Sequence, residues 1–228
     1  MPAHLARVGA LAAFSGAPTL LIATLLHPLD ADPNDPQAAF AEYAADPLWV
    51  VSHLGQFLGV VLLAVALLAL ADAANTEKAR TWARIGLLGA AASVAAAAAL
   101  QAVDGVALKA VVDRWAQATG EQQLRIFEAA FAVRQVEIGL ASLLSLLFGL
   151  TLAAYGASQL LGAHAWKWLG WLGLIGGLGS AGAGIAQAYT GFSAAAMALS
   201  MGASSLTLLW VLLVGVFLWR LRGREGAA

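Results

Sequence analysis

The chain has 228 residues, of which 61% are hydrophobic and 11% are charged, and its formal net charge is −1. Soluble domains carry roughly 25% charged residues, so this composition is typical of a membrane protein. The near-zero charge excludes the strongly basic surface of a nucleic-acid-binding protein, and we expect no nucleic-acid partner. The absence of cysteine excludes disulfides, thiolate metal sites and cysteine nucleophiles.

Long apolar runs predict six transmembrane helices, because a run of about 20 apolar residues is long enough to cross a bilayer. The first run ends in His-Pro without a small-residue cleavage site, so we expect a retained helix rather than a signal peptide. The predicted fold is an all-α, polytopic membrane helical bundle that forms a single integral membrane domain over residues 1–228. The predicted spans lie near residues 8–27, 48–71, 82–104, 128–155, 166–188 and 196–219.

The distribution of charge between the spans predicts the orientation of the bundle. Residues 28–47 carry acidic side chains and no lysine or arginine, whereas residues 72–84 and the C-terminal tail are basic. Because lysine and arginine gather on the cytoplasmic side, we expect a multi-pass protein with both termini cytoplasmic. Tryptophans mark the two interfaces, and Trp49 falls at the outer one. The basic residues assigned to the cytoplasmic side are Arg7, Lys78, Arg80, Arg84, Lys167, Arg220, Arg222 and Arg224.

The two charged links on the outer side are predicted to be partly helical. In the first link Asp35 is placed to cap a short helix, and Pro36 suits its first position. Phe40 and Tyr43 lie one turn apart and are expected to rest on the lipid surface. The link over residues 105–127 is expected to cover the bundle in the same way.

The fifth predicted span is rich in glycine. Small residues recur at every fourth position, at Gly173 and Gly177 and again at Gly176, Ser180 and Gly184. Such ridges let helices approach closely in lipid. We interpret this ridge as a packing face, either inside the protomer or between the protomers of a homo-oligomer.

The strongly polar residues within the spans are predicted to share one depth, in the outer half of the bundle. Such residues are costly in lipid and usually face the bundle interior. In four spans they form pairs three residues apart, which places each pair on one helix face. The sequence therefore predicts a polar, ligand-binding pocket that is open toward the outer face. Its predicted lining residues are His53, Gln56, Gln101, Asp104, Arg134 and Glu137, with His27 and Gln187 at the rim.

Three kinds of function are compatible with this pocket. Imidazole and carboxylate groups bind zinc and non-haem iron, so the pocket is compatible with a divalent metal site. The two histidines are also compatible with axial ligands of haem b. Buried carboxylates and histidines also serve in proton-linked transport of small solutes. The cluster can instead hold the bundle together without chemistry of its own. The predicted metal ligands are His27, His53, Asp104 and Glu137.

Three short stretches, LLHPLD, WVVSHLGQFLG and QAVDGVALKA, resemble a group of uncharacterised bacterial integral membrane proteins. These proteins have six predicted helices and are grouped as a domain of unknown function. The resemblance implies a helical bundle in the bacterial inner (plasma) membrane, in contact with the lipid bilayer. It implies no activity or ligand. We favour a protein that binds a metal or a small ligand and acts on a lipid or small amphiphile, and the sequence leaves open whether it is an enzyme.

Overall fold

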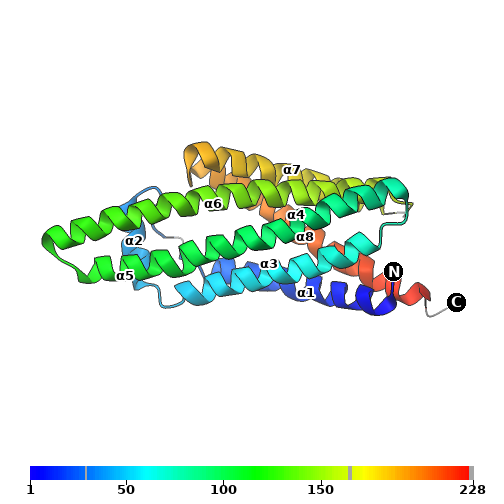
Figure 1. The fold of residues 1–228 in the computed structure, drawn as a ribbon, viewed down its shortest axis with the longest axis horizontal. Coiled ribbons are helices and arrows are strands. Elements are labelled where there is room, and N and C mark those ends of the chain that lie inside the picture. The colour runs from blue at the N-terminus through cyan, green and yellow to red at the C-terminus, as the bar shows by residue number, and fades with distance from the viewer. Residues whose placement is uncertain (29, 164–165, 226–228) are drawn as a thin grey trace.

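The computed structural model describes residues 1–28, 30–163 and 166–225, with side chains described as far as residue 221. The described segments are helical over most of their length (Figure 1). The helices are α1 (Ala3–Leu25), α2 (Pro36–Ala45), α3 (Trp49–Asp72), α4 (Glu77–Gln101), the π-helix η1 (Ala102–Leu108), α5 (Lys109–Gln117), α6 (Gly120–Leu161), α7 (Lys167–Thr190) and α8 (Ala194–Glu225).

The prediction of an all-α membrane bundle is confirmed. Within the described ranges, six helical segments are long and apolar enough to cross a membrane. Each contains one predicted span or nearly all of it. These segments are Ala3–Leu25, Trp49–Asp72, Glu77–Gln117, Gly120–Leu161, Lys167–Thr190 and Ala194–Leu221.

The third and fourth segments differ from the prediction in their length. They contain 41 and 42 residues, so each is about 60 Å long, twice the thickness of the hydrocarbon core. The prediction that residues 105–127 are partly helical is confirmed, and Val112 and Trp115 pack with α2 in a buried cluster, but these residues are not a link separate from the long helices. These residues continue α4 through η1 and α5, turn, and begin α6. The resulting helical hairpin projects beyond the other helices at the left of Figure 1.

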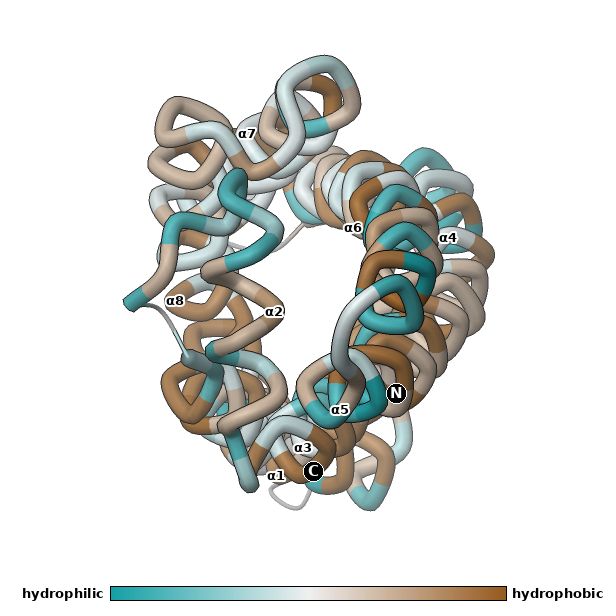
Figure 2. The backbone as a smooth tube through the Cα atoms, turned by 90° about the vertical axis from the view of Figure 1, so that its left-hand side faces the viewer, coloured by the Kyte–Doolittle hydropathy of each residue, from teal (hydrophilic) through white to brown (hydrophobic). Residues whose placement is uncertain are grey.

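The six long helices form a closed ring in the order α1, α3, α4, α6, α7 and α8, in which each helix packs on its two neighbours. Figure 2 shows this ring end on. Both chain termini lie at one end of the ring, and α2 and α5 lie at the opposite end (Figure 1). Residues on different helices at the same height can therefore meet inside the ring.

The short helix α2 forms as its sequence predicts. The Asp35 carboxylate accepts hydrogen bonds from the N–H groups of Gln37 and Ala38 at 3.1 and 3.2 Å. The expectation that Phe40 and Tyr43 rest on lipid is wrong, because their exposed fractions are only 0% and 3%. Both side chains belong to a buried cluster with aromatic residues of α3 and α5. Helix α2 thus covers one end of the ring.

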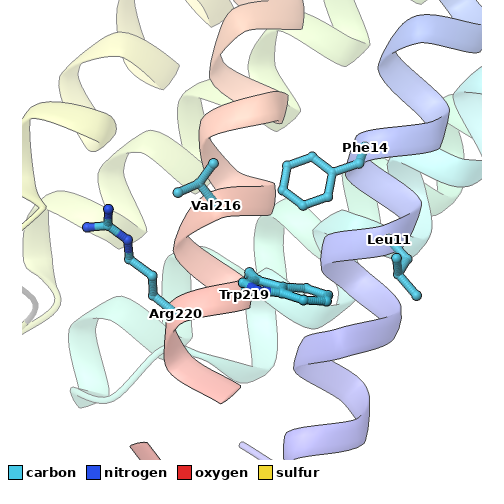
Figure 3. Close-up of a pocket in the computed structure, with 5 residues that line it drawn as sticks. All are labelled: Leu11, Phe14, Val216, Trp219 and Arg220. Atoms are coloured by element: carbon cyan, nitrogen blue, oxygen red, sulfur yellow. The ribbon is translucent and has the colours of Figure 1, made fainter. Parts of the chain in front are cut away.

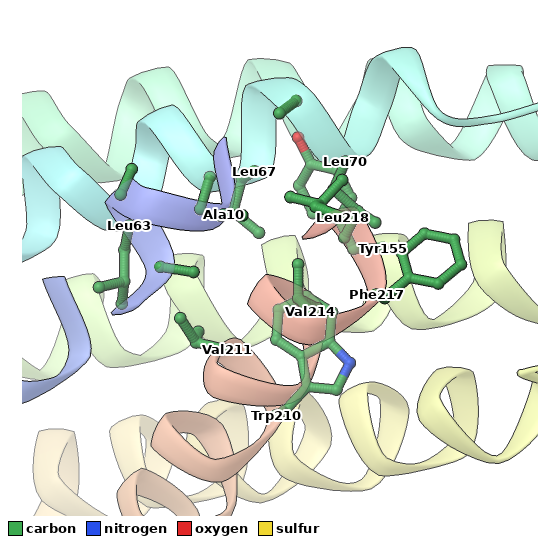
Figure 4. Packing of buried hydrophobic residues seen from close by; sticks show 14 of the residues in the cluster. Ala10, Leu63, Leu67, Leu70, Tyr155, Trp210, Val211, Val214, Phe217 and Leu218 are labelled. Atoms are coloured by element: carbon green, nitrogen blue, oxygen red, sulfur yellow. The ribbon is translucent and has the colours of Figure 1, made fainter. Parts of the chain in front are cut away.

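The half of the bundle near the termini has an apolar core. Side chains from α1, α3, α6 and α8 meet there around the indole ring of Trp210 (Figure 4). The indole N–H of Trp210 donates to the carbonyl oxygen of Leu169 at 3.0 Å, so this buried donor has a partner. The core residues labelled in Figure 4 are Ala10, Leu63, Leu67, Leu70, Tyr155, Trp210, Val211, Val214, Phe217 and Leu218.

The glycine ridge of α7 packs against α6 inside the protomer. A Cβ atom added at Gly177 would lie 2.6 Å from the carbonyl oxygen of Gly149, and one added at Gly184 would lie 2.5 Å from that of Ser142. The two backbones are therefore in direct contact, as the small-residue pattern predicts. A homo-oligomer through this span stays a prediction.

Replacing Gly149 with alanine is expected to destabilise the protein by about 1–3 kcal/mol, because overpacking a tight contact forces the backbones apart. The added Cβ would lie 2.4 Å from the backbone nitrogen of Ala181. Gly139 lies on the same helix with no atom within 4 Å of an added Cβ, so Gly139→Ala is the matched control. Thermal melts of both variants in detergent test this contact; equal melting temperatures would contradict it.

Candidate metal centre

Asp104 lies on the π-helix η1 (Ala102–Leu108) that interrupts the long α4–α5 helix. A π-helix adds a residue to a turn, is rare, and occurs frequently at functional sites. The next residue, Gly105, allows η1 to approach α3 closely, since a Cβ there would lie 2.5 Å from the Cβ of His53. The backbone of η1 thus brings the Asp104 carboxylate within reach of the buried His53 imidazole.

His53 and Asp104 are in direct contact. Nε2 of His53 lies 3.0 Å from Oδ2 of Asp104, and Nδ1 lies 2.6 Å from the carbonyl oxygen of Trp49. Because a carbonyl oxygen only accepts, Nδ1 carries the hydrogen, and Nε2 of the neutral ring has a lone pair. With a hydrogen on Nε2 as well, the ring is cationic and the two groups form an ion pair at 3.0 Å; without it, two acceptors face one another. This arrangement needs a proton or a cation between the two groups.

His27 follows the end of α1 and approaches the same place. Its Nδ1 lies 2.9 Å from the carbonyl oxygen of Pro28, which again leaves Nε2 as the free ring nitrogen. The imidazole rings of His27 and His53 have centroids 5.3 Å apart. Burial lowers the pKa of His27 below its usual value, against the opposing effects of the Pro28 carbonyl and Asp104. His27 is therefore neutral near pH 7, as a metal ligand must be.

Among the described residues, His27, His53 and Asp104 form a group with the chemistry of a metal site. Each offers one ligand atom, and these atoms lie within 4.8 Å of one another. Zinc binds nitrogen and oxygen donors at about 2.0–2.2 Å, so small rotations of the side chains would close the group around one ion. Backbone carbonyls that hold Nδ1 of both histidines are the outer partners that orient metal-binding imidazoles.

Glu137, the fourth predicted ligand, lies outside this group. Its Oε2 accepts a hydrogen bond from Nη1 of Arg134 at 2.9 Å, and the exposed fractions of the two side chains are only 4% and 7%. Nη2 of Arg134 also donates to the carbonyl oxygen of Pro33 at 3.3 Å. The guanidinium lies over the rings of Tyr43 and Phe192. The buried pair therefore joins α6 to the loops at the covered end of the ring.

The predicted glutamines supply a third polar contact and several unused hydrogen-bonding groups. Nε2 of Gln101 donates to Oε1 of Gln56 at 3.2 Å. Within the described part of the chain, Oε1 of Gln101, Oδ1 of Asp104 and Nε2 of Gln187 are buried without a hydrogen-bond partner. Buried polar atoms without partners are costly. The Asp104 carboxylate therefore has one oxygen, Oδ1, that is available to bind a cation.

Trp49 connects the ligands to one another, a role that its prediction as an interface residue did not include. It is fully buried, and its ring packs on those of His27 and His53 with centroid separations of 4.7 and 4.6 Å. Its indole N–H donates to the carbonyl oxygen of Asp104 at 3.0 Å, while its own carbonyl holds His53.

Glu42 also positions the loop next to the site, a role that no pattern in the sequence indicates. Its carboxylate accepts hydrogen bonds from the backbone N–H groups of Asp30 and Ala31 at 2.9 and 3.3 Å. Helix α2 thereby holds the loop that follows His27. The acidic link between the first two spans is thus partly structural, because one of its carboxylates binds its own backbone.

Replacing Trp49 with phenylalanine is expected to weaken metal binding about tenfold, the lower end of the effect of losing an outer partner of a metal site. The substitution keeps an aromatic ring beside the imidazoles but removes the N–H that holds η1 at Asp104. Competition titration with a zinc-sensitive dye measures the affinity. Trp168→Phe, at the opposite end and 51% exposed, is the control. Equal zinc affinities for both variants would contradict this role.

Protonation of His27 is expected to make an unfavourable contribution to the stability of the metal-free protein as the pH falls below about 6.5, the ordinary pKa of histidine. The pKa of His27 is lowered in the folded state, so the unfolded chain takes up the proton first and acid favours unfolding. Thermal melts in the presence of a chelator, at a series of pH values, measure this contribution. His27→Gln should flatten the pH dependence and His4→Gln should not; identical profiles would contradict the assignment.

Comparisons of the chain with protein-family models, with curated protein sequences and with solved structures found no match.

Proposed function

We propose that this chain is a metal-binding integral membrane protein whose site is formed by His27, His53 and Asp104. The observation that carries the proposal is the direction of the two imidazoles. A backbone carbonyl accepts from Nδ1 of each ring, Nε2 of His53 lies beside the Asp104 carboxylate, and one ligand atom from each of the three residues lies within 4.8 Å of the others. Two imidazoles and one carboxylate are a ligand set used by zinc and by non-haem iron.

The proposed site has three protein ligands and hence an open position for a fourth. Catalytic zinc sites have this arrangement, and the open position holds water or substrate. A metal-bound water has a lowered pKa and serves as a nucleophile near neutral pH. The site lies at the end of a membrane bundle, under α2. A lipid headgroup or a small amphiphile is therefore the class of substrate that we propose.

We propose that both termini are cytoplasmic and that the metal site lies toward the outer face. The support is the charge pattern: Lys78, Arg80 and Arg84 lie at the same end of the ring as the termini. Cytoplasmic ends of membrane helices carry such an excess of basic residues. Location in a bacterial inner membrane and membership of the uncharacterised six-helix family belong to the same proposal.

A proton-linked transporter is the second candidate, and the Arg134–Glu137 pair is the observation that favours it. A buried ion pair inside a ring of helices is the kind of group that proton relays use. If the protein is a transporter, Glu137→Gln should abolish proton-coupled uptake of the solute into vesicles and leave folding intact. In a purely structural bundle the same substitution would mainly lower the melting temperature.

Elemental analysis of the purified, detergent-solubilised protein tests the metal proposal. After exposure to zinc, manganese and iron salts and removal of the excess, we expect nearly one metal ion for each chain. The His53→Ala variant, purified in the same way, should retain almost none. A folded wild-type protein that holds no metal would overturn the proposal and favour the transporter.

A further inference from the structure

A groove lies between α1 and α8, far from the candidate metal centre. Its volume is about 430 Å³, and the parts of α1 and α8 that form it lie toward the end of the bundle that holds the termini. Figure 3 shows the side chains that line it: Leu11 and Phe14 on α1, and Val216, Trp219 and Arg220 on α8. Four of these five side chains are apolar or aromatic.

The shape of the groove comes from small residues in the two helices. A Cβ atom added at Gly215 would lie 2.8 Å from Cε1 of Phe14, so α8 approaches α1 closely at this point. The large side chains of Leu11 and Phe14 nevertheless remain 49% and 37% exposed. The protein thus presents an apolar slot between α1 and α8 whose lining side chains are partly exposed.

Two basic residues, Arg220 and Arg7, lie in or near the slot, and Figure 3 shows the Arg220 side chain extending from α8 on the side away from α1. Arg220 lines the groove, and its guanidinium lies 5.2 Å from the centre of the Trp166 ring, which stacks on Trp168. Tryptophans at a helix end mark the membrane interface. Arg7 is exposed and lies one helical turn before Leu11, so both residues share one face of α1. None of the described residues that line the groove is acidic.

We propose that this groove binds an anionic phospholipid. One acyl chain lies along Leu11, Phe14 and Val216, and the phosphate lies at the interface near Arg220 and Arg7. An apolar slot with Arg220 in its lining and Arg7 one helical turn from Leu11 matches the two halves of such a lipid. A basic residue near an anionic lipid surface improves binding about fivefold, so the site prefers a lipid with net negative charge. This proposal is independent of the metal centre.

Native mass spectrometry of the full-length protein, released from detergent with defined lipids, tests the headgroup preference. Phosphatidylglycerol and phosphatidylcholine with the same acyl chains are added at equal concentrations. We expect phosphatidylglycerol to bind at least fivefold more tightly, and Arg220→Gln to reduce this preference about fivefold. Arg84→Gln is the matched control, because Arg84 is exposed on α4, which packs on α3 and α6 rather than on α1 or α8.

Two further results decide the proposal. Leu11→Trp fills the slot and should lower the occupancy of both lipids, while leaving metal binding unchanged. Arg7→Gln repeats the charge test if Arg220→Gln fails to fold. The proposal is overturned if the wild type binds the two lipids equally. It is also overturned if the Arg84 and Arg220 substitutions have equal effects, or if Leu11→Trp leaves lipid occupancy unchanged.

Discussion

Replacing Arg134 with methionine is expected to lower the free energy of unfolding by about 3–5 kcal/mol. The guanidinium and the Glu137 carboxylate are both buried and lie 2.9 Å apart, so removing Arg134 leaves a carboxylate without its partner in a low-dielectric interior. The variant also loses the hydrogen bond to the carbonyl oxygen of Pro33 and the contact with the Tyr43 ring. Unfolding in mixed micelles of sodium dodecyl sulfate and a mild detergent measures the change.

The double variant Arg134→Met with Glu137→Leu is the control for this prediction. Well-packed apolar residues can replace a buried ion pair with little loss, so the double variant should recover most of the stability. Arg125→Met, which breaks an exposed i,i+4 pair with Glu121, should cost less than about 1 kcal/mol. A loss in Arg134→Met no larger than that in Arg125→Met would contradict the structural role of the buried pair.

Zinc is expected to stabilise the protein by about 2.7 kcal/mol when its free concentration is 100 times the dissociation constant, because the ion binds the folded state alone. Asp104→Ala should abolish this stabilisation, since it removes one of the three ligands and the contact with His53. Melting curves with and without zinc measure the effect.

The matched control for the zinc experiment is Asp113→Ala. Asp113 is also an aspartate, lies nine residues further along the same long helix, and pairs with Lys109 outside the candidate site. The Asp113 variant should keep the full zinc-induced stabilisation. If zinc stabilises both variants to the same extent, the ion binds elsewhere, and the assignment of Asp104 as a ligand is wrong.

The number and the approximate positions of the six membrane helices could be predicted, because hydrophobic runs are the strongest sequence signal of a membrane protein. The ends of the third and fourth helices could not. Residues 105–127 contain charged side chains such as Lys109 and Arg114, which suggest a link between spans. In the structure they continue the third and fourth long helices as a helical hairpin, and polarity alone does not distinguish these two arrangements.

The partners inside the candidate site depend on features with no local signal. The spacing of polar residues places each pair on one helix face, yet it does not say that His53 meets Asp104 or that Gln56 meets Gln101. Those contacts require the ring order of the helices and the extra residue of η1. Arg134 and Glu137, by contrast, lie three residues apart on one helix, and their contact follows directly from that spacing.

Trp49 begins α3, at the helix end where the sequence places it, but both Trp49 and Tyr43 are buried. Both were expected at the lipid or interface level, where amphipathic rings are common. The fold of α2 over the end of the ring places them inside, with ring centroids 4.2 Å apart. Long-range packing of a short helix decided this outcome, and nothing in the local pattern of residues 36–49 distinguishes a buried cover from a helix on the membrane surface.

X-ray absorption spectroscopy of the zinc-loaded protein tests the central claim, the metal centre of His27, His53 and Asp104, most directly. The expected spectrum contains two imidazole nitrogens and at least one oxygen at about 2.0–2.2 Å from zinc. His27→Ala should reduce the imidazole signal by half. A zinc site surrounded by oxygen alone, or an imidazole signal unchanged by this substitution, would contradict the proposed metal centre.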